Sequence, residues 1–203
     1  MLSTWIKARA WQNPALRYFL GNSGNIPLAS RGYIISGDFQ QLLGRKPSDE
    51  EYRALRDHLD QGAPLPDGEV FERLQNQRRS LFGSPFNPSE RSYREALEQS
   101  FGAFMESSLI VAERAVQNGH FPQVNPQGSR SSRITRGKPG AIHIVASLKL
   151  PILPVSVLGM RSAMPNQGLR SRGGEIVVRC GEPYRPALEG LSDATPSRLH
   201  RSR

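Results

Sequence analysis

The chain has 203 residues, the length of one ordinary domain with room for a core, and its formal net charge is +9. A single cysteine, Cys180, excludes an internal disulfide and a Cys-based zinc site, and it fits a reducing compartment. No apolar run reaches the roughly 18–20 residues of a membrane-spanning helix, and no signal-peptide pattern follows Met1. These features predict a cytoplasmic protein that is soluble or peripheral on the inner face of a membrane.

The positive charge is unevenly placed along the chain. Residues 1–123 carry 14 basic and 14 acidic side chains, whereas residues 124–203 carry 13 basic and 4 acidic ones. Such an excess predicts a polyanionic partner: a phosphorylated small molecule, a phospholipid surface or a nucleic acid. Because 23 of the 27 cations are arginine, as GC-rich coding often gives, an origin in codon bias stays open.

The first ninety residues predict mostly helices and loops. Residues 3–20 have a helical pattern that Pro14 interrupts, and residues 26–29 form a short extended segment. Ser48-Asp49-Glu50-Glu51 is a capping box that starts a helix running towards His58. A second polar helix is expected over residues 69–79, with loops over 61–68 and 82–88. We interpret residues 36–90 as a polar, loosely anchored helical insertion.

The next segment is the best-defined helix of the sequence. Asn87-Pro88-Ser89-Glu90 supplies a start signal, with an Asn cap and Pro at the first helical position. Apolar side chains then recur every three or four residues, and Asn118-Gly119 supplies the stop. This stripe predicts core packing and comprises Leu97, Phe101, Met105, Leu109, Ala112 and Val116.

After this helix the pattern changes to strands and loops. We expect an extended run at residues 121–125, a loop at 126–140, a helix at 141–148 and strands at 152–158 and 175–179. The apolar run 152–158 is typical of a strand covered on both faces, although Pro154 is awkward in a central strand. The order of these elements indicates an α/β domain.

The loop carries the most informative chemistry. It begins Pro126-Gln127-Gly128-Ser129-Arg130-Ser131 and continues with Arg133, Arg136 and Lys138. Gly128 and the serines let backbone N–H groups approach an anion, and Arg130 can hold a phosphate bidentately. A helix that begins near Ala141 would direct its N-terminus at the same anion. The pattern predicts a phosphate-binding loop, with a merely solvated basic loop as the open alternative.

Four blocks in order resemble the glycerolipid acyltransferase family, which includes the lysophosphatidate acyltransferases. Pro126 to Ser131 resembles the family's F-P-E-G-T-R-S, and Lys138-Pro139-Gly140-Ala141 follows it, as does a proline-rich strand block, Leu150-Pro151-Ile152-Leu153-Pro154-Val155. Gly181-Glu182-Pro183 ends a later strand, as in the family. Upstream, Gly24 to Arg31 is similar to its G-x-I-x-x-x-R block. The resemblance covers residues 93–186 best.

The resemblance implies a fold, a reaction and site residues. The fold would be α/β, a mixed sheet flanked by helices, incomplete at its N-terminus. Its parts would be a helix and the Arg31 block (1–35), the insertion (36–90), the core (91–186) and a basic flexible tail (187–203). An acyl group would pass from acyl-CoA or acyl carrier protein, as co-substrate without a cofactor, to a lysophospholipid or glycerol-phosphate hydroxyl. The acceptor phosphate would be bound by Arg31, Gln127, Gly128, Ser129, Arg130 and Lys138, and the acyl site would include Pro151, Ile152 and Pro154.

Two departures from the family pattern qualify this expectation. The family's catalytic H-x-x-x-x-D pair is missing, because none of the four histidines has an aspartate five residues later. The simplest hypothesis is a chain that begins downstream of this pair and is inactive alone. Gln127 also stands where the family has Glu, which keeps the shape but removes the charge.

Other residues offer no replacement base or nucleophile. His143 is expected to be a partly buried helix residue, His58 and His120 structural or exposed, and Cys180 a core thiol. No metal-ligand spacing is present. Two alternatives stay open: a catalytically dead family member that binds lysophospholipid or an anionic membrane surface, and a nucleic-acid or anionic-surface binding module. Nucleic acid is not expected, because the basic half has few aromatic residues for base stacking.

Overall fold

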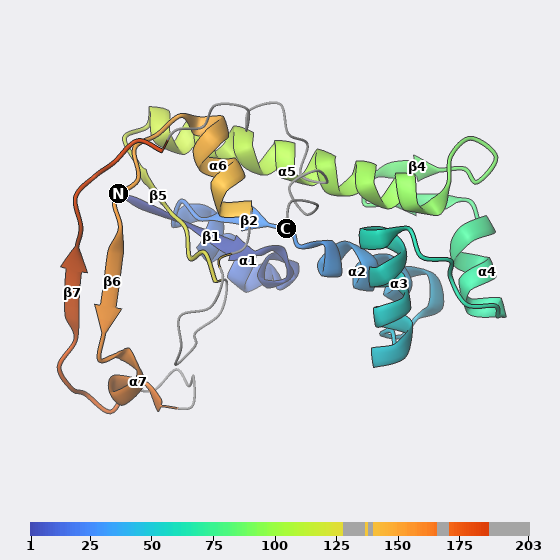
Figure 1. The fold of residues 1–203 in the computed structure, drawn as a ribbon, viewed down its shortest axis with the longest axis horizontal. Coiled ribbons are helices and arrows are strands. Elements are labelled where there is room, and N and C mark those ends of the chain that lie inside the picture. Colours follow the sequence, from blue (N-terminus) through green and yellow to red (C-terminus); the bar gives the residue numbers. More distant parts are fainter. Residues whose placement is uncertain (128–136, 138–139, 166–170, 187–203) are drawn as a thin grey trace. The chain divides into compact units, whose positions relative to one another are not determined.

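The computed structural model describes residues 1–127, 137, 140–165 and 171–186 (Figure 1). The chain divides into two compact units, Met1–Gln123 and Val124–Arg203, so the division falls inside the segment 91–186 that the sequence suggests as one core. The fold is α/β with small sheets flanked by helices, which confirms the coarse prediction. Among the described residues, however, the strands form a three-stranded sheet and two separate strand pairs instead of one mixed sheet.

The first unit contains a parallel sheet of order β2-β1-β5. Its strands are β1 (Leu2–Lys7), β2 (Ile26–Leu28) and β5 (Phe121–Gln123), with Trp5 opposite Ile26 and Leu2 opposite Phe121. A 3₁₀ helix, η1 (Ala8–Gln12), and a helix, α1 (Pro14–Asn22), connect β1 to β2. The crossover from β1 to β2 is thus the helical connection that parallel strands require.

The helix predicted over residues 3–20 is wrong in its first part. Ser3 and Trp5 are buried while the residues between and after them are more open, an alternation of period two that suits a strand paired on both sides. Pro14 begins α1 and does not interrupt a helix, because the Asn13 side chain accepts hydrogen bonds from the amides of Ala15 and Leu16. Pairing with β2 and β5 overrode the local helical pattern.

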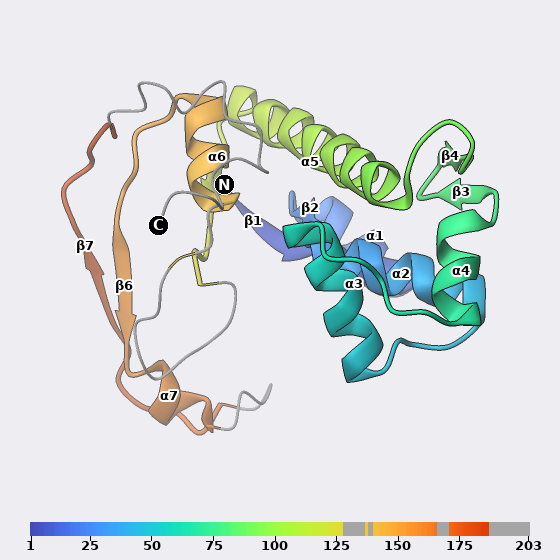
Figure 2. The ribbon, with the colours of Figure 1, turned by 45° about the vertical axis from the view of Figure 1, so that its right-hand side comes forward.

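Four helices and a hairpin make up the rest of the first unit (Figure 2). They are α2 (Arg31–Leu43), α3 (Asp49–Gln61), α4 (Glu69–Asn76), the hairpin of β3 (Arg79–Leu81) and β4 (Ser84–Phe86), and α5 (Tyr93–Gln117). The Ser48 capping box is confirmed, with its Oγ accepting from the Glu51 amide. The loop predicted over residues 82–88 is wrong in part. Phe82 and Gly83, with φ of 50° and 91°, form the turn of a hairpin for which Phe-Gly is a weak sequence signal.

The long helix α5 begins later than its sequence start signal. Ser92 is the N-cap and forms a capping box with Glu95, whereas Asn87 closes a turn by accepting from the Glu90 and Arg91 amides. The helix ends at Gln117, and Gly119 follows with φ of 76°, as the stop signal predicted. The apolar stripe is confirmed as packing: Leu97, Met105 and Ala112 are buried, and the other three are partly buried.

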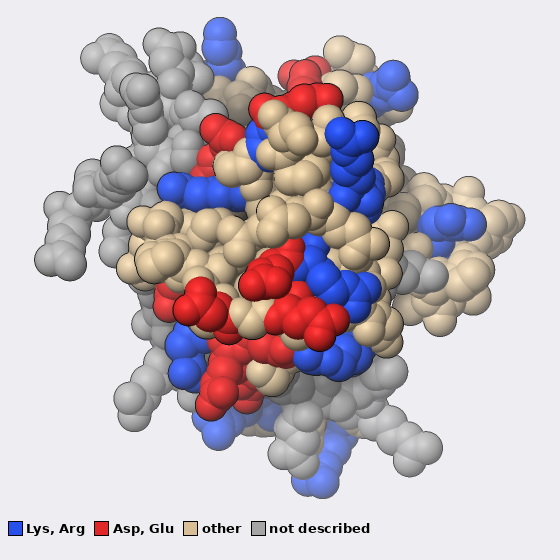
Figure 3. All heavy atoms as spheres, turned by 90° about the vertical axis from the view of Figure 1, so that its right-hand side faces the viewer, with Lys and Arg blue, Asp and Glu red and all other residues tan. Residues whose placement is uncertain are grey.

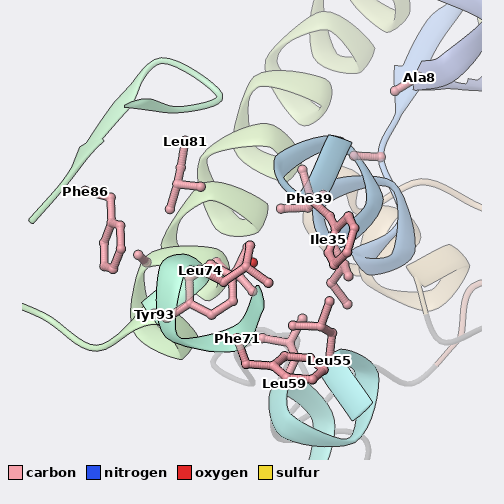
Figure 4. Close-up of a cluster of buried hydrophobic side chains, with 14 residues drawn as sticks. Ala8, Ile35, Phe39, Leu55, Leu59, Phe71, Leu74, Leu81, Phe86 and Tyr93 are labelled. Atoms are coloured by element: carbon pink, nitrogen blue, oxygen red, sulfur yellow. The ribbon is translucent and has the colours of Figure 1, made fainter. Parts of the chain in front are cut away.

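The largest buried cluster lies in the segment interpreted as loosely anchored, so that interpretation is wrong (Figure 4). Its fully buried side chains come from α2, α3 and α4 and meet α5 and the β3–β4 hairpin. The apolar positions are sparse in this polar sequence, but each helix directs them to one common centre. The cluster comprises Ala8, Ala29, Ile34, Ile35, Phe39, Leu55, Leu59, Phe71, Leu74, Leu81, Phe86, Tyr93, Ala96 and Leu97.

The second unit contains α6 (Gly140–Leu148), β6 (Val155–Leu158), α7 (Met160–Ala163) and β7 (Val177–Cys180). The predicted helix at 141–148 and the strands within 152–158 and 175–179 are confirmed in outline. β6 and β7 are antiparallel, with Val155 opposite Cys180. The basic tail, residues 187–203, lies outside the described residues.

The prediction of a strand covered on both faces is wrong for β6. Its four residues are all exposed, Val155 by 53% and Val157 by 47%. Pro154 immediately precedes the strand, where its missing N–H costs no ladder hydrogen bond, and its carbonyl accepts from Gly181 N at 2.8 Å. Cys180 is exposed as well, so the expectation of a core thiol is also wrong. Within the described part of the chain, no helix is long and apolar enough to cross a membrane.

Candidate functional site

The predicted phosphate-binding loop begins directly after the sheet of the first unit. Gly128, Ser129, Arg130 and Lys138 lie outside the described residues, as do Arg133 and Arg136. Both ends of the loop are described: a Cβ added to Gly137 would lie 3.3 Å from the Pro126 Cβ, so the two ends meet closely. Gln127, at the entrance, is partly buried. Helix α6 then begins at Gly140, next to the predicted Ala141.

The parallel sheet places Arg31 just past the end of a strand. In open α/β sheets, ligands bind outside the carboxyl ends of the strands, and Arg31 comes three residues after Leu28, the last residue of β2. The strands do not end at one level: Leu28 lies opposite Lys7, the last residue of β1, whereas Gln123, the last residue of β5, lies opposite Thr4.

Arg31 itself is engaged inside the first unit. Its Nη1 donates to Asp60 Oδ1 at 2.7 Å, and its guanidinium lies 5.5 Å from the centre of the Phe101 ring. The Arg56 Nε donates to the other Asp60 oxygen. Burial tends to raise the pKa of Asp60, but hydrogen bonds from the two arginines outweigh this, and the pKa is lowered. An ionised Asp60 thus occupies the position on Arg31 that an acceptor phosphate would take.

The face that carries α3 and α4 is mixed in charge: Figure 3 shows acidic and basic side chains intermingled on it. The first turns of these helices contribute Asp49, Glu50 and Glu51, and Glu69 and Glu72, and in α3 they lie at the opposite end from Asp60. Next to Arg31, Asp60 is shared with Arg56, so an anion would reach Arg31 by exchange with this carboxylate.

A second charged cluster, at Asp38, is fully enclosed and escaped the sequence interpretation. Arg79 donates from Nε and Nη2 to the two Asp38 oxygens, each at 2.8 Å, and the Tyr93 hydroxyl donates to Oδ2 at 2.7 Å. Asp38 is 0% exposed. Burial of the Tyr93 hydroxyl, together with the negative charge of Asp38, raises the pKa of Tyr93 well above its usual value. The buried carboxylate is fully paired, and Arg79 also donates to the Gln77 carbonyl, so the loss of either charge would leave the other uncompensated. The sequence signal for this cluster is Asp38 itself, an acidic residue among the apolar residues Ile34, Ile35 and Phe39.

The described histidines have structural partners, as expected. His58 Nδ1 donates to the Ala63 carbonyl at 2.6 Å, just past the end of α3. His120 Nδ1 lies 2.9 Å from Ser3 Oγ and links β1 to the residue before β5. Ser3 is 0% exposed, so a substrate cannot reach its hydroxyl and Ser3 cannot act as a nucleophile. The His143 side chain and His200 lie outside the described residues. Among the side chains described, no cluster of three His, Cys, Asp or Glu could hold a metal.

The predicted acyl-site block forms the open end of the β6–β7 pair. Ile152 and Tyr184 exchange two backbone hydrogen bonds of 2.8 and 3.0 Å, and Pro154 accepts from Gly181. Pro151 and Pro154 are exposed, and Leu153 between them is 52% exposed. The block therefore presents exposed apolar and proline side chains at this end of the strand pair.

Comparisons with protein-family models, with curated proteins and with solved structures gave no significant match to this chain.

Proposed function

We propose that this chain is an acceptor-binding domain of the glycerolipid acyltransferase type. It binds a lysophospholipid or a glycerol phosphate through its phosphate group and presents the acceptor hydroxyl for acyl transfer from acyl-CoA or acyl carrier protein. The phosphate is bound by Gly128, Ser129 and Arg130, with Gln127 and Lys138 beside them. The family resemblance adds Arg31 to this set, and Arg31 would have to exchange Asp60 for a phosphate.

One observation carries this proposal: the succession of a parallel strand, a basic loop, a helix and an antiparallel strand pair. β5 leads into a loop whose ends meet at Pro126 and Gly137, and α6 begins three residues after Gly137. A helix N-terminus and a glycine-serine loop are a favourable environment for a phosphate. The exposed apolar side chains of the Pro151 to Pro154 block supply the surface that a fatty acyl chain needs.

The proposal assigns binding to this chain and no complete catalysis. Acyl transfer needs a general base on the acceptor hydroxyl, and no histidine here has the aspartate partner of the family pattern. We expect the purified chain to show no transfer from acyl-CoA to lysophosphatidate. Measurable turnover that disappears in His143→Ala would contradict this expectation and make His143 the base.

Because the proposed acceptor is a lipid, we place the protein on an anionic membrane surface. The excess of basic residues after position 124 supports this location, since cationic segments are attracted to anionic lipid headgroups. The cationic excess outside the loop serves this attraction in the proposal, and nucleic acid is not needed to account for it.

The decisive experiment titrates the full chain with glycerol 3-phosphate and with lysophosphatidate and measures binding by calorimetry. We expect Arg130→Gln to weaken binding more than about tenfold, because a bidentate charged hydrogen-bonding partner is lost. The matched control is Arg179→Gln, which removes the same charge from an exposed position of β7 and should change affinity less than threefold. Equal effects of both substitutions would mean that only general charge attracts the ligand.

A second variant tests the role of Arg31. Asp60→Asn removes the charge that competes for this arginine, so the affinity for the phosphate group should rise severalfold. Arg31→Gln combined with Asp60→Asn should remove that gain. If Asp60→Asn leaves the affinity unchanged, Arg31 is a structural residue and the loop binds the acceptor without it. If nucleic acid binds and glycerol 3-phosphate does not, the acceptor proposal fails.

A further inference from the structure

Helix α1 exposes apolar side chains that nothing in the first unit covers. Leu16 is 47%, Tyr18 78% and Phe19 64% exposed, although all three are large and apolar or aromatic. Of the nine residues of α1, Leu20 is the buried one. Isolated exposed apolar residues are ordinary, but three within four positions of one helix form a surface feature.

These side chains share one side of the helix. With 3.6 residues per turn, Tyr18, Ala15, Phe19 and Leu16 follow one another around an arc of about 160°, and Leu20 continues that arc into the protein. One polar residue, Asn22, lies in the arc between Tyr18 and Ala15, and its side chain donates to the Tyr18 carbonyl. Arg17 lies outside the arc. The arrangement is an amphipathic helix that packs on its own unit along one line and turns its remaining apolar arc outwards.

The helix is held in place independently of the exposed arc. The Asn13 side chain caps its first turn, and Ser23 Oγ donates to the Phe19 carbonyl at 2.7 Å at its end. Gly21 lies against the Trp11 ring, because a Cβ added there would be 4.0 Å from the ring carbon. The apolar side chains are therefore presented on a preformed support and need no folding upon binding.

The charge around α1 indicates the kind of partner. Residues 1–37 contain four cations, Lys7, Arg9, Arg17 and Arg31, and no acidic residue, and of these Arg31 is paired with Asp60. Lys7 and Arg17 are exposed, and the first acid of the chain, Asp38, is buried against Arg79. A twofold contact between copies through α1 would place like charges together, whereas an anionic surface neutralises them. Aromatic and aliphatic side chains with neighbouring cations are the composition of interfacial helices.

We propose that α1 is a docking surface for an anionic lipid bilayer. Leu16 and Phe19 enter the boundary between headgroups and acyl chains, Tyr18 lies at the level of the headgroups, and Lys7 and Arg17 contact lipid phosphates. The inference rests on the proposed function for the choice of a lipid partner, and it adds the element by which the first unit reaches the lipid. So short an apolar arc gives reversible attachment.

The test is flotation of the full chain with vesicles that contain no lysophospholipid. We compare phosphatidylcholine vesicles with vesicles in which a quarter of the lipid is phosphatidylglycerol, and we expect binding to the second kind. Leu16→Ser combined with Phe19→Ser should weaken it more than about tenfold, because two apolar side chains no longer enter the bilayer. Arg17→Gln should weaken it about fivefold and reduce its dependence on salt.

The matched control is Ile110→Ser combined with Val111→Ser on α5. These side chains are 45% and 40% exposed in the same unit, so the control removes similar apolar surface from another place and should bind vesicles as the unchanged chain does. Thermal unfolding of both double variants should stay close to that of the unchanged chain, since the substituted side chains are exposed.

The outcomes separate this inference from the proposed function. Vesicle binding that survives the Leu16 and Phe19 substitutions overturns the docking surface, even if glycerol 3-phosphate binds normally. A dimer in sedimentation that the same substitutions convert to a monomer also overturns it, because α1 would then contact a second copy. Vesicle binding through α1 without affinity for either acceptor would leave the docking surface intact and refute the acceptor site.

Discussion

The helical part of the first unit buries its apolar side chains, whereas the β6–β7 pair of the second unit exposes them. In the first, Phe39, Leu55 and Leu97 are 0% exposed and meet in one cluster. In the second, Val155, Val157 and Val178 are 47–58% exposed, and the two strands pair only with one another among the described residues. Composition does not explain this contrast, because the helices are polar and the strands are apolar.

The contrast shows where the chain obtains its stability and where it keeps surface for other partners. A two-stranded pair with both faces open is marginal by itself, while several helices around one centre are self-sufficient. The neutral half of the sequence therefore holds the core, and the basic half holds exposed apolar strands beside the proposed phosphate loop. Four predictions test this division, from the largest expected effect to the smallest.

Asp38→Asn should give the largest loss of stability. It leaves the buried Arg79 guanidinium without its counter-charge, which costs about 3–5 kcal/mol in comparable buried pairs. Chemical denaturation followed by the fluorescence of Trp5 and Trp11 measures the loss. The control is Glu98→Gln, whose surface pair with Arg94 spans 3.6 Å and should contribute less than about 1 kcal/mol. Equal losses would show that the Asp38 cluster does not stabilise the unit.

Leu97→Ala and Val178→Ala compare the two regions directly. Leu97 is 0% exposed and its truncation should cost about 2–5 kcal/mol, whereas Val178 is 58% exposed and its truncation should cost within about 0.5 kcal/mol. Both are measured by thermal and chemical unfolding. A loss at Val178 as large as that at Leu97 would mean that another part of the chain or a second copy covers the strand pair.

Ser92→Ala tests the start of α5. The serine caps the helix and completes a capping box with Glu95, so its removal should cost about 1 kcal/mol. Ser92→Thr keeps the hydroxyl and should retain most of the stability. If Ser92→Thr is as damaging as Ser92→Ala, packing at this position matters and capping does not.

The hydrogen bonds of Glu51 predict a small loss of folding stability as the pH is lowered. Hydrogen bonds from Arg45, opposed by slight burial and aided by the Ser48 amide, lower its pKa from 4.5 to about 2. A lowered folded-state pKa contributes stability that is fully present above pH 4.5 and is lost as the pH falls towards about 2. The side chains are exposed to screening solvent, so the effect should stay below about 1 kcal/mol.

Urea unfolding between pH 6 and pH 2 measures this contribution. Glu51→Gln should remove this part of the pH dependence, and Glu50→Gln, the exposed neighbour, should leave it. A pH profile that is identical for the unchanged chain and Glu51→Gln would contradict the prediction.

Local signals predicted most helices well. The capping box at Ser48, the stripe on α5 and the Asn118-Gly119 stop all describe short-range chemistry, and each is found in the structure. One failure occurred where long-range pairing competed with a local pattern: residues 3–7 are a strand because β2 and β5 pair with them. Another was a choice between two local start signals, since Ser92 with Glu95 forms the capping box of α5 and Asn87 closes a turn before it.

The residues of the candidate site could be predicted from the sequence, but the side chains that contact them could not. The loop from Pro126 to Lys138 follows from the residue types alone, since glycine, serine and arginine together favour an anion. That Asp60 holds Arg31 could not be predicted, because the two residues lie on different helices, 29 positions apart. The enclosed Asp38 cluster likewise joins residues from α2, β3 and α5.

The sequence by itself determined the charge division, the α/β class, the composition of the proposed anion loop and the absence of the histidine–aspartate pair, because these depend on residue type and short spacing. Only the tertiary structure decided which polar helices enclose a core, which apolar strands stay exposed and which carboxylate occupies Arg31. Burial and ion pairing depend on residues distant in the chain meeting in space, and no local pattern contains that information.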